Sequence, residues 1–157
     1  METLSKVVVL SLGGSLGVNA RYWLGVWISG ISSPRFPWAT FLINVSGSFA
    51  IGFLTYILAR WLPHPNLRIF LLTGFLGGYT TFSTFEYDLL ASWERGEHRM
   101  AAANLIGSVG LGFAAVVLGT ALARGISEPR ERTGNPASHP AAAAAEPRKA
   151  GDHDHRQ

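Results

Sequence analysis

The chain has 157 residues, a length typical of one domain, and 48% of them are hydrophobic while only 15% are charged. Soluble proteins carry about 25% charged residues, so this composition favours a membrane protein. The absence of cysteine excludes disulfides, thiol nucleophiles and thiolate metal sites. The net charge of +3 comes largely from loops and the C-terminal end, without the basic stripe that binding of nucleic acid requires.

Four apolar runs approach the length of about 20 residues that a helix needs to cross a bilayer. The runs cover residues 7–30, 36–59, 69–85 and 100–123. We therefore predict an all-α membrane domain over residues 1–124, with helices at roughly 4–30, 36–60, 68–92 and 99–124. Short connections predict that neighbouring helices are antiparallel. The five tryptophans fall near predicted helix ends, where indole rings favour the membrane interface.

We expect the first run to be a permanent membrane helix. It is longer than the apolar core of a signal peptide, it contains Arg21, and no convincing cleavage site follows a short apolar core. An ionisable residue inside a membrane segment is a candidate functional group. Because Arg21 lies toward the second end of this run, we favour a structural role or a place in a vestibule.

The second run is uncharged, and Asn44 lies near its middle. An amide in hydrocarbon is costly unless it is hydrogen-bonded, so Asn44 must face protein or water. Two interpretations are open: the amide forms a hydrogen bond between helices, or it belongs to a site for an ion.

The third run is short and glycine-rich, and it reads TGFLGGYTTFSTF over residues 73–85. Glycine weakens a helix, so the Gly77–Gly78 pair predicts a break near the middle of this segment. A break in a membrane frees carbonyls and amides, which must be satisfied by protein or by a wet cavity. The freed carbonyls suit a cation such as Na⁺, whereas a glycine kink patched by threonine and serine hydroxyls would need no ion.

Two phenylalanines follow the predicted break. Phe82 and Phe85 are three residues apart and share one helix face. Such rings usually pack against side chains or lipid, but here they alternate with Thr81, Ser83 and Thr84. Because a phenyl ring has a positive edge, ring edges with hydroxyl and amide donors could hold a small anion without a fixed positive charge. Conduction needs sites that bind the ion only weakly, because the ion must also leave.

Basic residues flank the two predicted membrane faces in nearly equal number. One face has Lys6, Arg60 and Arg68, and the other has Arg35, Arg95 and Arg99. The positive-inside rule then gives little preference, so either both orientations occur or the C-terminal charges set a single one. Residues 125–157 are polar and proline-rich, and we expect a disordered tail there.

Three blocks of this sequence resemble the small fluoride channels called Fluc or CrcB proteins. The blocks are GGSLGVNARY at residues 13–22, TFLINVSGSF at 40–49 and GFLGGYTTFSTF at 74–85, and the last is the most specific. The resemblance covers roughly residues 4–124. It implies an all-α subunit of four transmembrane helices, the third broken near its middle, that pairs with an inverted copy as an antiparallel homodimer. It also implies a multi-pass protein of the inner or plasma membrane that exports fluoride passively.

The resemblance further implies roles for particular positions. The implied fluoride path consists of Asn44, Thr81, Phe82, Ser83, Phe85 and Ser108. Backbone carbonyls of Gly77 and Thr80 from each subunit would hold a structural, untransported Na⁺ at the dimer centre. Asn104 occupies a position where some members carry tyrosine, and Gly112 and Val116 lack hydroxyls that some members have.

Two other functions compete with a channel. A proton-coupled multidrug exporter needs a membrane-embedded carboxylate, but no acidic residue lies between Glu2 and Glu86 or inside the fourth run. A scaffold protein would not need the cluster of Thr, Ser and Phe in a broken helix. We expect no enzyme, because no pair of nucleophile and base can be placed. Fluoride as the ion rests on the resemblance alone.

Overall fold

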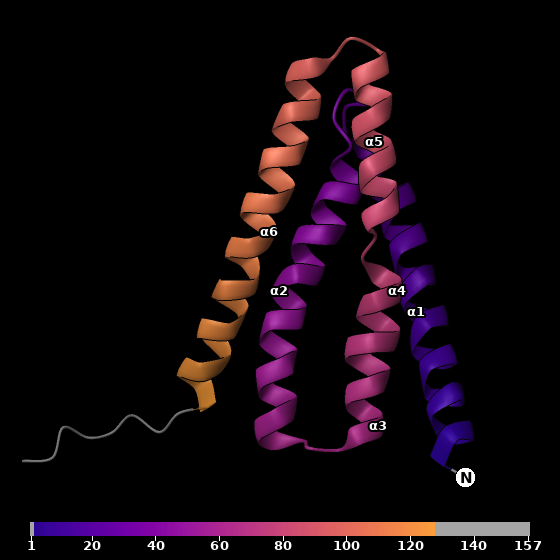
Figure 1. The fold of residues 1–157 in the computed structure, drawn as a ribbon, viewed down its shortest axis with the longest axis vertical. Helices are drawn as coiled ribbons and strands as arrows, with labels where there is room; N and C mark the ends of the chain where they lie inside the picture. Colours follow the sequence, from indigo (N-terminus) through magenta and orange to yellow (C-terminus); the bar gives the residue numbers. More distant parts are fainter. Residues whose placement is uncertain (1, 128–157) are drawn as a thin grey trace, which may run out of the picture.

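The protein is a bundle of helices joined by short loops, described here from a computed structural model over residues 2–127 (Figure 1). The elements in chain order are α1 (Glu2–Ile31), α2 (Trp38–Trp61), α3 (Pro65–Arg68), the π-helical stretch η1 (Ile69–Leu76), α4 (Gly77–Tyr79), α5 (Phe82–Glu94) and α6 (His98–Ser127). Within these residues there is no strand. The N-terminal end of α1 and the C-terminal end of α6 lie at the same end of the bundle as α3 (Figure 1).

Three of the helices, α1, α2 and α6, are long and apolar enough to cross a membrane. Large apolar side chains point outward from them in the isolated chain, among them Leu12, Ile106 and Phe113, which are more than half exposed. Exposed apolar surface of this extent is suited to lipid rather than to water. The chain is therefore a multi-pass membrane protein, as its composition predicts.

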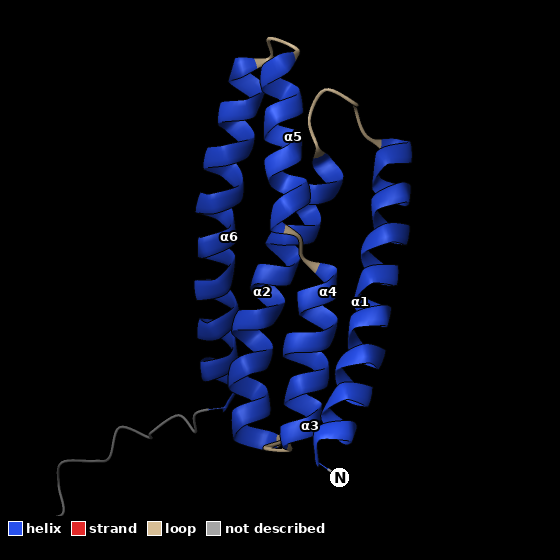
Figure 2. Cartoon of the chain, turned by 45° about the vertical axis from the view of Figure 1, so that its right-hand side comes forward, coloured by secondary structure: helices blue, strands red, loops and turns tan. Residues whose placement is uncertain are grey.

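The third predicted segment is divided into shorter helices, with a loop at mid-height of the bundle (Figure 2). The stretch from α3 through η1 and α4 is continuous, and α5 begins only after Thr80 and Thr81. Both threonines have extended backbones, with φ/ψ of −80°/158° and −150°/124°. The Gly77–Gly78 pair, at which the sequence predicts the break, is itself helical. The interruption follows that pair because Thr81 caps α5 rather than continuing α4.

Proline and glycine set the other helix ends. Pro63 disfavours helical geometry at Leu62, where α2 has ended. Pro65 occupies the first turn of α3, where a missing N–H costs nothing. Gly96 has a φ of 73° in the turn from α5 to α6, a left-handed conformation that glycine adopts without strain.

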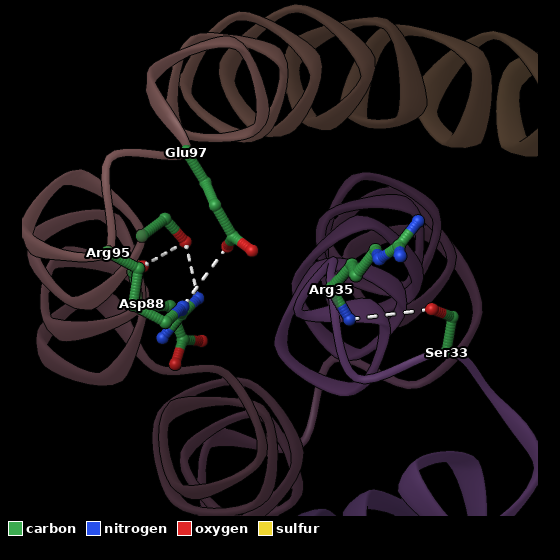
Figure 3. A network of polar contacts seen from close by, with 6 residues as sticks. Ser33, Arg35, Asp88, Arg95 and Glu97 are labelled. Atoms are coloured by element: carbon green, nitrogen blue, oxygen red, sulfur yellow. Dashed lines mark hydrogen bonds and ion pairs between the residues drawn. The ribbon is translucent and has the colours of Figure 1, made fainter.

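A polar network fixes this turn at the end of the bundle (Figure 3). The Nε atom of Arg95 pairs with Oε2 of Glu97 at 3.1 Å, and its Nη2 donates to Oγ of Ser92 at 3.2 Å. The Ser92 hydroxyl in turn donates to the Asp88 carbonyl at 2.8 Å. These bonds tie the last turns of α5 to Glu97, the residue that precedes α6.

Close backbone packing places α2 at the centre of the bundle. It runs along α6 on one side and also contacts η1, α4 and α5. A β-carbon on Gly52 would collide with the Val116 carbonyl oxygen, and one on Gly119 with the Phe49 carbonyl oxygen. Small residues allow membrane helices to approach this closely. The result is that the middle of α2 faces the interruption in the third segment.

The C-terminal end of α6 extends past the predicted boundary at residue 124. The helix continues to Ser127, whose hydroxyl accepts a hydrogen bond from Nε1 of Trp61 at 3.0 Å. The first three residues of the expected tail are thus helical. The remainder of that tail, residues 128–157, lies outside the described part of the chain.

Candidate functional site

Asn44 satisfies the backbone at the interruption. Its Nδ2 atom donates to the Thr81 carbonyl at 2.8 Å, and its Oδ1 atom accepts from the Thr81 N–H at 2.9 Å. One amide side chain therefore replaces both backbone hydrogen bonds that a continuous helix would give Thr81. An amide carries two N–H donors, so a second donor of Asn44 stays available for another partner. The sequence alternatives for Asn44, a hydrogen bond between helices and a place at a site, are thus compatible.

The two threonines at the interruption are held by local hydrogen bonds. The Thr81 hydroxyl accepts from the Thr84 N–H at 3.3 Å and so caps α5, and it donates to the Thr84 hydroxyl at 3.1 Å. Thr80 closes α4, since its N–H and its hydroxyl each donate to the Leu76 carbonyl at 2.9 Å. The extended dipeptide is therefore a fixed feature of the segment, with its polar groups engaged by protein.

A cavity of about 380 Å³ lies beside the interruption, between α2, the third segment and α6, and we call it the α6-side cavity. It gathers most of the residues predicted for the ion path: Asn44, Thr81, Phe82, Phe85 and Ser108. The other lining residues are Gly47, Ser48, Ile51, Leu72, Leu76, Gly77, Thr80 and Val109. None of these side chains carries a charge, so polar contact in the cavity comes from amide, hydroxyl and backbone groups.

The two phenylalanines differ in burial although both line this cavity. Phe85 is 5% exposed, whereas Phe82 is 70% exposed in the isolated chain. Their ring centroids are 5.9 Å apart and the rings are tilted by 40°. Tilted rings at this distance present edges as well as faces, and the edge is the positive part of the ring. Ser83, the remaining predicted residue, is exposed and does not line the cavity.

The wall that α6 contributes contains a hydrogen-bonded pair. The Ser108 hydroxyl donates to Oδ1 of Asn104 at 2.9 Å. Asn104 is 1% exposed, it lies one helical turn behind Ser108, and it does not line the cavity. Its Nδ2 atom is buried with no hydrogen-bond partner among the described residues. Two polar residues four apart on an apolar helix predict such a pair, whereas the family resemblance marks Asn104 only as a position where some members carry tyrosine.

A second cavity of about 600 Å³, the α1-side cavity, contains a positive charge. It is lined by Arg21 together with Thr81, Thr84, Thr40 and other residues of α1 and α2. The Nη1 atom of Arg21 donates to the Thr80 carbonyl at 3.4 Å. The predicted vestibule residue thus touches the interruption itself, from the side opposite Ser108. This cavity shares only Thr81 with the α6-side cavity.

The two carbonyls expected to hold Na⁺ meet different surroundings. In a continuous helix the Gly77 carbonyl would accept from the Thr81 N–H, but that N–H bonds Asn44 instead. A β-carbon built on Gly77 would meet nothing within 4 Å, so this face is open. The Thr80 carbonyl, by contrast, already accepts from Arg21. Neutral backbone oxygens are suitable Na⁺ ligands, and within residues 2–127 no cluster of His, Cys, Asp or Glu offers an alternative site.

Comparison with known proteins gives one family and many relatives. The family described as CrcB-like protein, Camphor Resistance (CrcB), matches residues 8–120. A protein of Solibacter usitatus named fluoride-specific ion channel FluC is 48% identical over 120 residues, which is 76% of this chain and 98% of the relative. Proteins of the same name from Nitrobacter winogradskyi and Rhizobium meliloti are 45% and 43% identical, over 75% and 77% of this chain and 94% and 98% of their own lengths. Their name describes a channel, not an enzyme.

Proposed function

Because this chain belongs to the CrcB family, whose relatives are named fluoride-specific ion channels, we propose that it is a passive channel that exports fluoride. The observation that carries the proposal is the α6-side cavity, which brings Asn44, Thr81, Phe85 and Ser108 together beside a helix interruption. Fluoride is a small, strongly hydrated anion, so a site for it must supply hydrogen-bond donors. The second N–H of Asn44 is such a donor, the Ser108 hydroxyl becomes one when its proton turns from Asn104 to the cavity, and the ring edges of Phe82 and Phe85 add positive partial charge.

The absence of charge among the residues lining this cavity favours conduction of the anion over its tight retention. A full cation beside a small anion in a medium of low dielectric constant would hold it tightly. Neutral donors bind more weakly and allow the ion to leave, which conduction requires. No carboxylate lines the cavity either, so the exchange of protons for a cationic drug has no carrier group there.

We further propose that residues 65–94 form the fourth crossing of the membrane. Neither α5 alone, with 13 residues, nor the helical stretch before the interruption reaches the roughly 20 residues that a span needs, whereas together they do. Non-helical backbone at membrane depth is tolerated only where protein or water satisfies it. The two hydrogen bonds from Asn44 to Thr81 supply that requirement.

An inverted second copy would complete the site. The exposed ring of Phe82 and the open face at Gly77 both belong to the α6-side cavity, and a partner packed there would bury them. The Gly77 and Thr80 carbonyls of two subunits would together offer four oxygens to a structural Na⁺. The balanced basic residues at the two ends of the bundle are consistent with insertion in both orientations in the cell membrane.

The proposed function is tested by fluoride efflux from liposomes that contain the purified protein, followed with a fluoride electrode. We expect fluoride efflux well above that of protein-free liposomes, and chloride efflux no greater than in those controls. Equal rates for the two anions, or no fluoride efflux, would refute the proposal.

The Na⁺ proposal needs a separate experiment. Replacing Na⁺ on both sides by N-methylglucamine should abolish efflux or dissociate the dimer, while radioactive Na⁺ should not be transported. Full activity in buffer freed of trace Na⁺, or transport of Na⁺ with fluoride, would show that Gly77 and Thr80 hold no structural Na⁺.

A further inference from the structure

A third cavity lies at the end of the bundle where α1 joins α2 and α5 joins α6, and we call it the loop-end cavity. It has a volume of about 310 Å³ and is lined by residues from the end of α1, the following loop, the start of α2 and the second half of α5. Both loops lie at the same end of the bundle (Figure 2). Three exposed tryptophans, Trp27, Trp38 and Trp93, lie close to these helix ends. Because indole rings favour the membrane interface, we place the cavity at the level of the lipid headgroups.

Asp88 gives this cavity a negative charge that protein does not neutralise. Its Oδ2 atom is enclosed and has no hydrogen-bond partner among residues 2–127. Arg95 also lines the cavity, but its guanidinium pairs with Glu97, and no ion pair joins it to Asp88 within the described residues (Figure 3). An enclosed carboxylate is unfavourable unless a cation or hydrogen-bond donors face it. Since a carboxylate repels anions, fluoride is not the ligand that this cavity suits.

The serine hydroxyls in the cavity add acceptors rather than donors. The Ser32 hydroxyl donates to the Ile28 carbonyl at 2.7 Å, and the Ser92 hydroxyl donates to the Asp88 carbonyl at 2.8 Å. A carbonyl oxygen can only accept, so each serine has used its single proton and can act toward a ligand only as an acceptor. Together with the Asp88 carboxylate, these oxygens favour a positively charged group with several N–H donors.

Arg95 adds the opposite chemical character to the same cavity. Its Nε atom donates to Glu97 and its Nη2 atom to Ser92, whereas Nη1 takes part in neither bond. The side chain is half exposed, so it remains accessible from the headgroup region. A guanidinium is well suited to bind a phosphate. The cavity thus combines a carboxylate that needs a cationic donor with a guanidinium that has N–H groups for an anion.

We propose that the loop-end cavity binds the zwitterionic headgroup of a phospholipid with a primary ammonium, as in phosphatidylethanolamine. The ammonium has three N–H donors and lies against Oδ2 of Asp88 and the hydroxyl oxygen of Ser32. The phosphodiester lies against Nη1 of Arg95. The acyl chains continue along the apolar outer surface of the helices, where large side chains are exposed.

Other cationic ligands fit this cavity less well. At about 30 Å³ for each water, its volume corresponds to about ten waters, far more space than a bare metal ion fills. Divalent cations also prefer several charged oxygen ligands, and Asp88 is the one acidic residue among the described residues that line the cavity. A choline headgroup has the positive charge but no N–H, so it cannot donate to Asp88 or Ser32. The number of N–H groups on the headgroup is therefore what the cavity distinguishes.

Native mass spectrometry of the purified full-length protein tests the proposal with four short-chain phospholipids of equal acyl length. These are phosphatidylethanolamine, its N,N-dimethyl derivative, phosphatidylcholine and phosphatidylglycerol. We expect one phosphatidylethanolamine per subunit, with affinity that falls as methyl groups replace N–H, to about tenfold weaker binding of phosphatidylcholine. Phosphatidylglycerol, which lacks the ammonium, should bind no better than phosphatidylcholine. Equal affinities for the four lipids would overturn the proposal. Displacement of phosphatidylethanolamine by an equal concentration of free ethanolamine would also overturn it, because the ligand would then be a soluble amine.

Three variants assign the binding to particular residues. Asp88→Asn should weaken binding of phosphatidylethanolamine about tenfold and remove its preference over phosphatidylcholine. Arg95→Gln should weaken both lipids alike, because both contain the phosphate. Glu94→Gln is the control, since Glu94 is an exposed acid of the same helix outside the cavity, and it should match the wild type.

An unchanged lipid preference in Asp88→Asn would overturn the proposal and would mean that water alone satisfies the carboxylate. If Asp88→Asn does not fold, the series of methylated lipids decides the question on the wild type. None of these measurements depends on fluoride flux, so failure of this inference leaves the proposed function intact, and failure of the proposed function leaves this inference intact.

Discussion

The two cavities that meet at Thr81 differ in charge. The α6-side cavity is lined by neutral groups such as Asn44, Phe85 and Ser108, whereas the α1-side cavity contains the guanidinium of Arg21. Both approach the same interrupted backbone, and both place hydrogen-bonding groups of threonine along their walls. We infer that a positive charge serves to attract anions toward the interruption, while neutral donors let them pass.

The difference also shows how one helix interruption can border both a neutral and a charged cavity. Asn44 engages the N–H and C=O of Thr81 from α2, and Arg21 engages the Thr80 carbonyl from α1. The dipeptide is thereby held from two sides, and its backbone groups are satisfied without water. Substitutions on the two sides should therefore have different effects, which we give from the largest to the smallest.

The largest effect is expected for Asn44→Ala. This change removes both bonds to Thr81, and each lost partner of a buried backbone group costs about 1–3 kcal/mol. Fluoride flux should fall by about a hundredfold or more, with a lower melting temperature in detergent. Asn19→Ala is the control, because Asn19 bonds only the Ser15 carbonyl on the exposed side of α1. Flux within twofold of wild type in Asn44→Ala would show that this residue is not part of the fluoride path.

Phe85→Ile should have the next largest effect. Isoleucine keeps much of the apolar volume of this buried position but has no positive ring edge. We expect fluoride flux to fall about tenfold while the protein stays folded by circular dichroism, since a ring-edge contact is worth about 1 kcal/mol. Phe113→Ile, at a position 73% exposed on α6, should change neither quantity. Equal losses in the two variants would mean that ring edges have no special role.

Arg21→Gln tests the charged side of the comparison. Loss of the guanidinium lowers the local concentration of anions, so fluoride flux should fall about threefold at low ionic strength. At high ionic strength the difference should shrink, because salt screens exposed charges. The exposed Arg68 provides the control variant Arg68→Gln, which should show little change at any salt concentration. A loss in Arg21→Gln that does not vary with salt would indicate a purely structural role.

The smallest effect is expected for Ser83→Ala. Ser83 is exposed and lies outside the α6-side cavity, in contrast to Thr81 two residues before it. Fluoride flux should stay within about twofold of wild type, as for most surface substitutions. A large loss of flux would mean that a second copy brings Ser83 into the path. Crosslinking of the inverted dimer through this position would then be the next experiment.

Much of the fold can be read from the sequence, because run length and loop chemistry report directly on membrane helices. The apolar runs give α1, α2 and α6, and prolines and glycine mark several helix ends. The position of the interruption is harder to predict. Gly77 and Gly78 weaken the helix locally, but the break occurs where Asn44 offers hydrogen bonds from another helix, and that partner depends on tertiary structure.

The candidate site likewise combines patterns that are visible along the sequence with contacts between residues far apart in it. The cluster around Phe82 and Phe85 is visible as a pattern, and so is a lone amide at Asn44. The bond from Arg21 to the Thr80 carbonyl is not, because it joins residues 59 positions apart. Nor does the sequence reveal that Asn104 is fully buried with an unpaired donor, since burial depends on the packing of α6 against its neighbours.

The most direct test of the central claim is a reversal potential in a planar bilayer that contains this protein, with opposed gradients of fluoride and chloride. We predict that the current reverses near the equilibrium potential of fluoride, because neutral donors in the α6-side cavity favour the small anion. Reversal near the equilibrium potential of chloride or of a cation would contradict it.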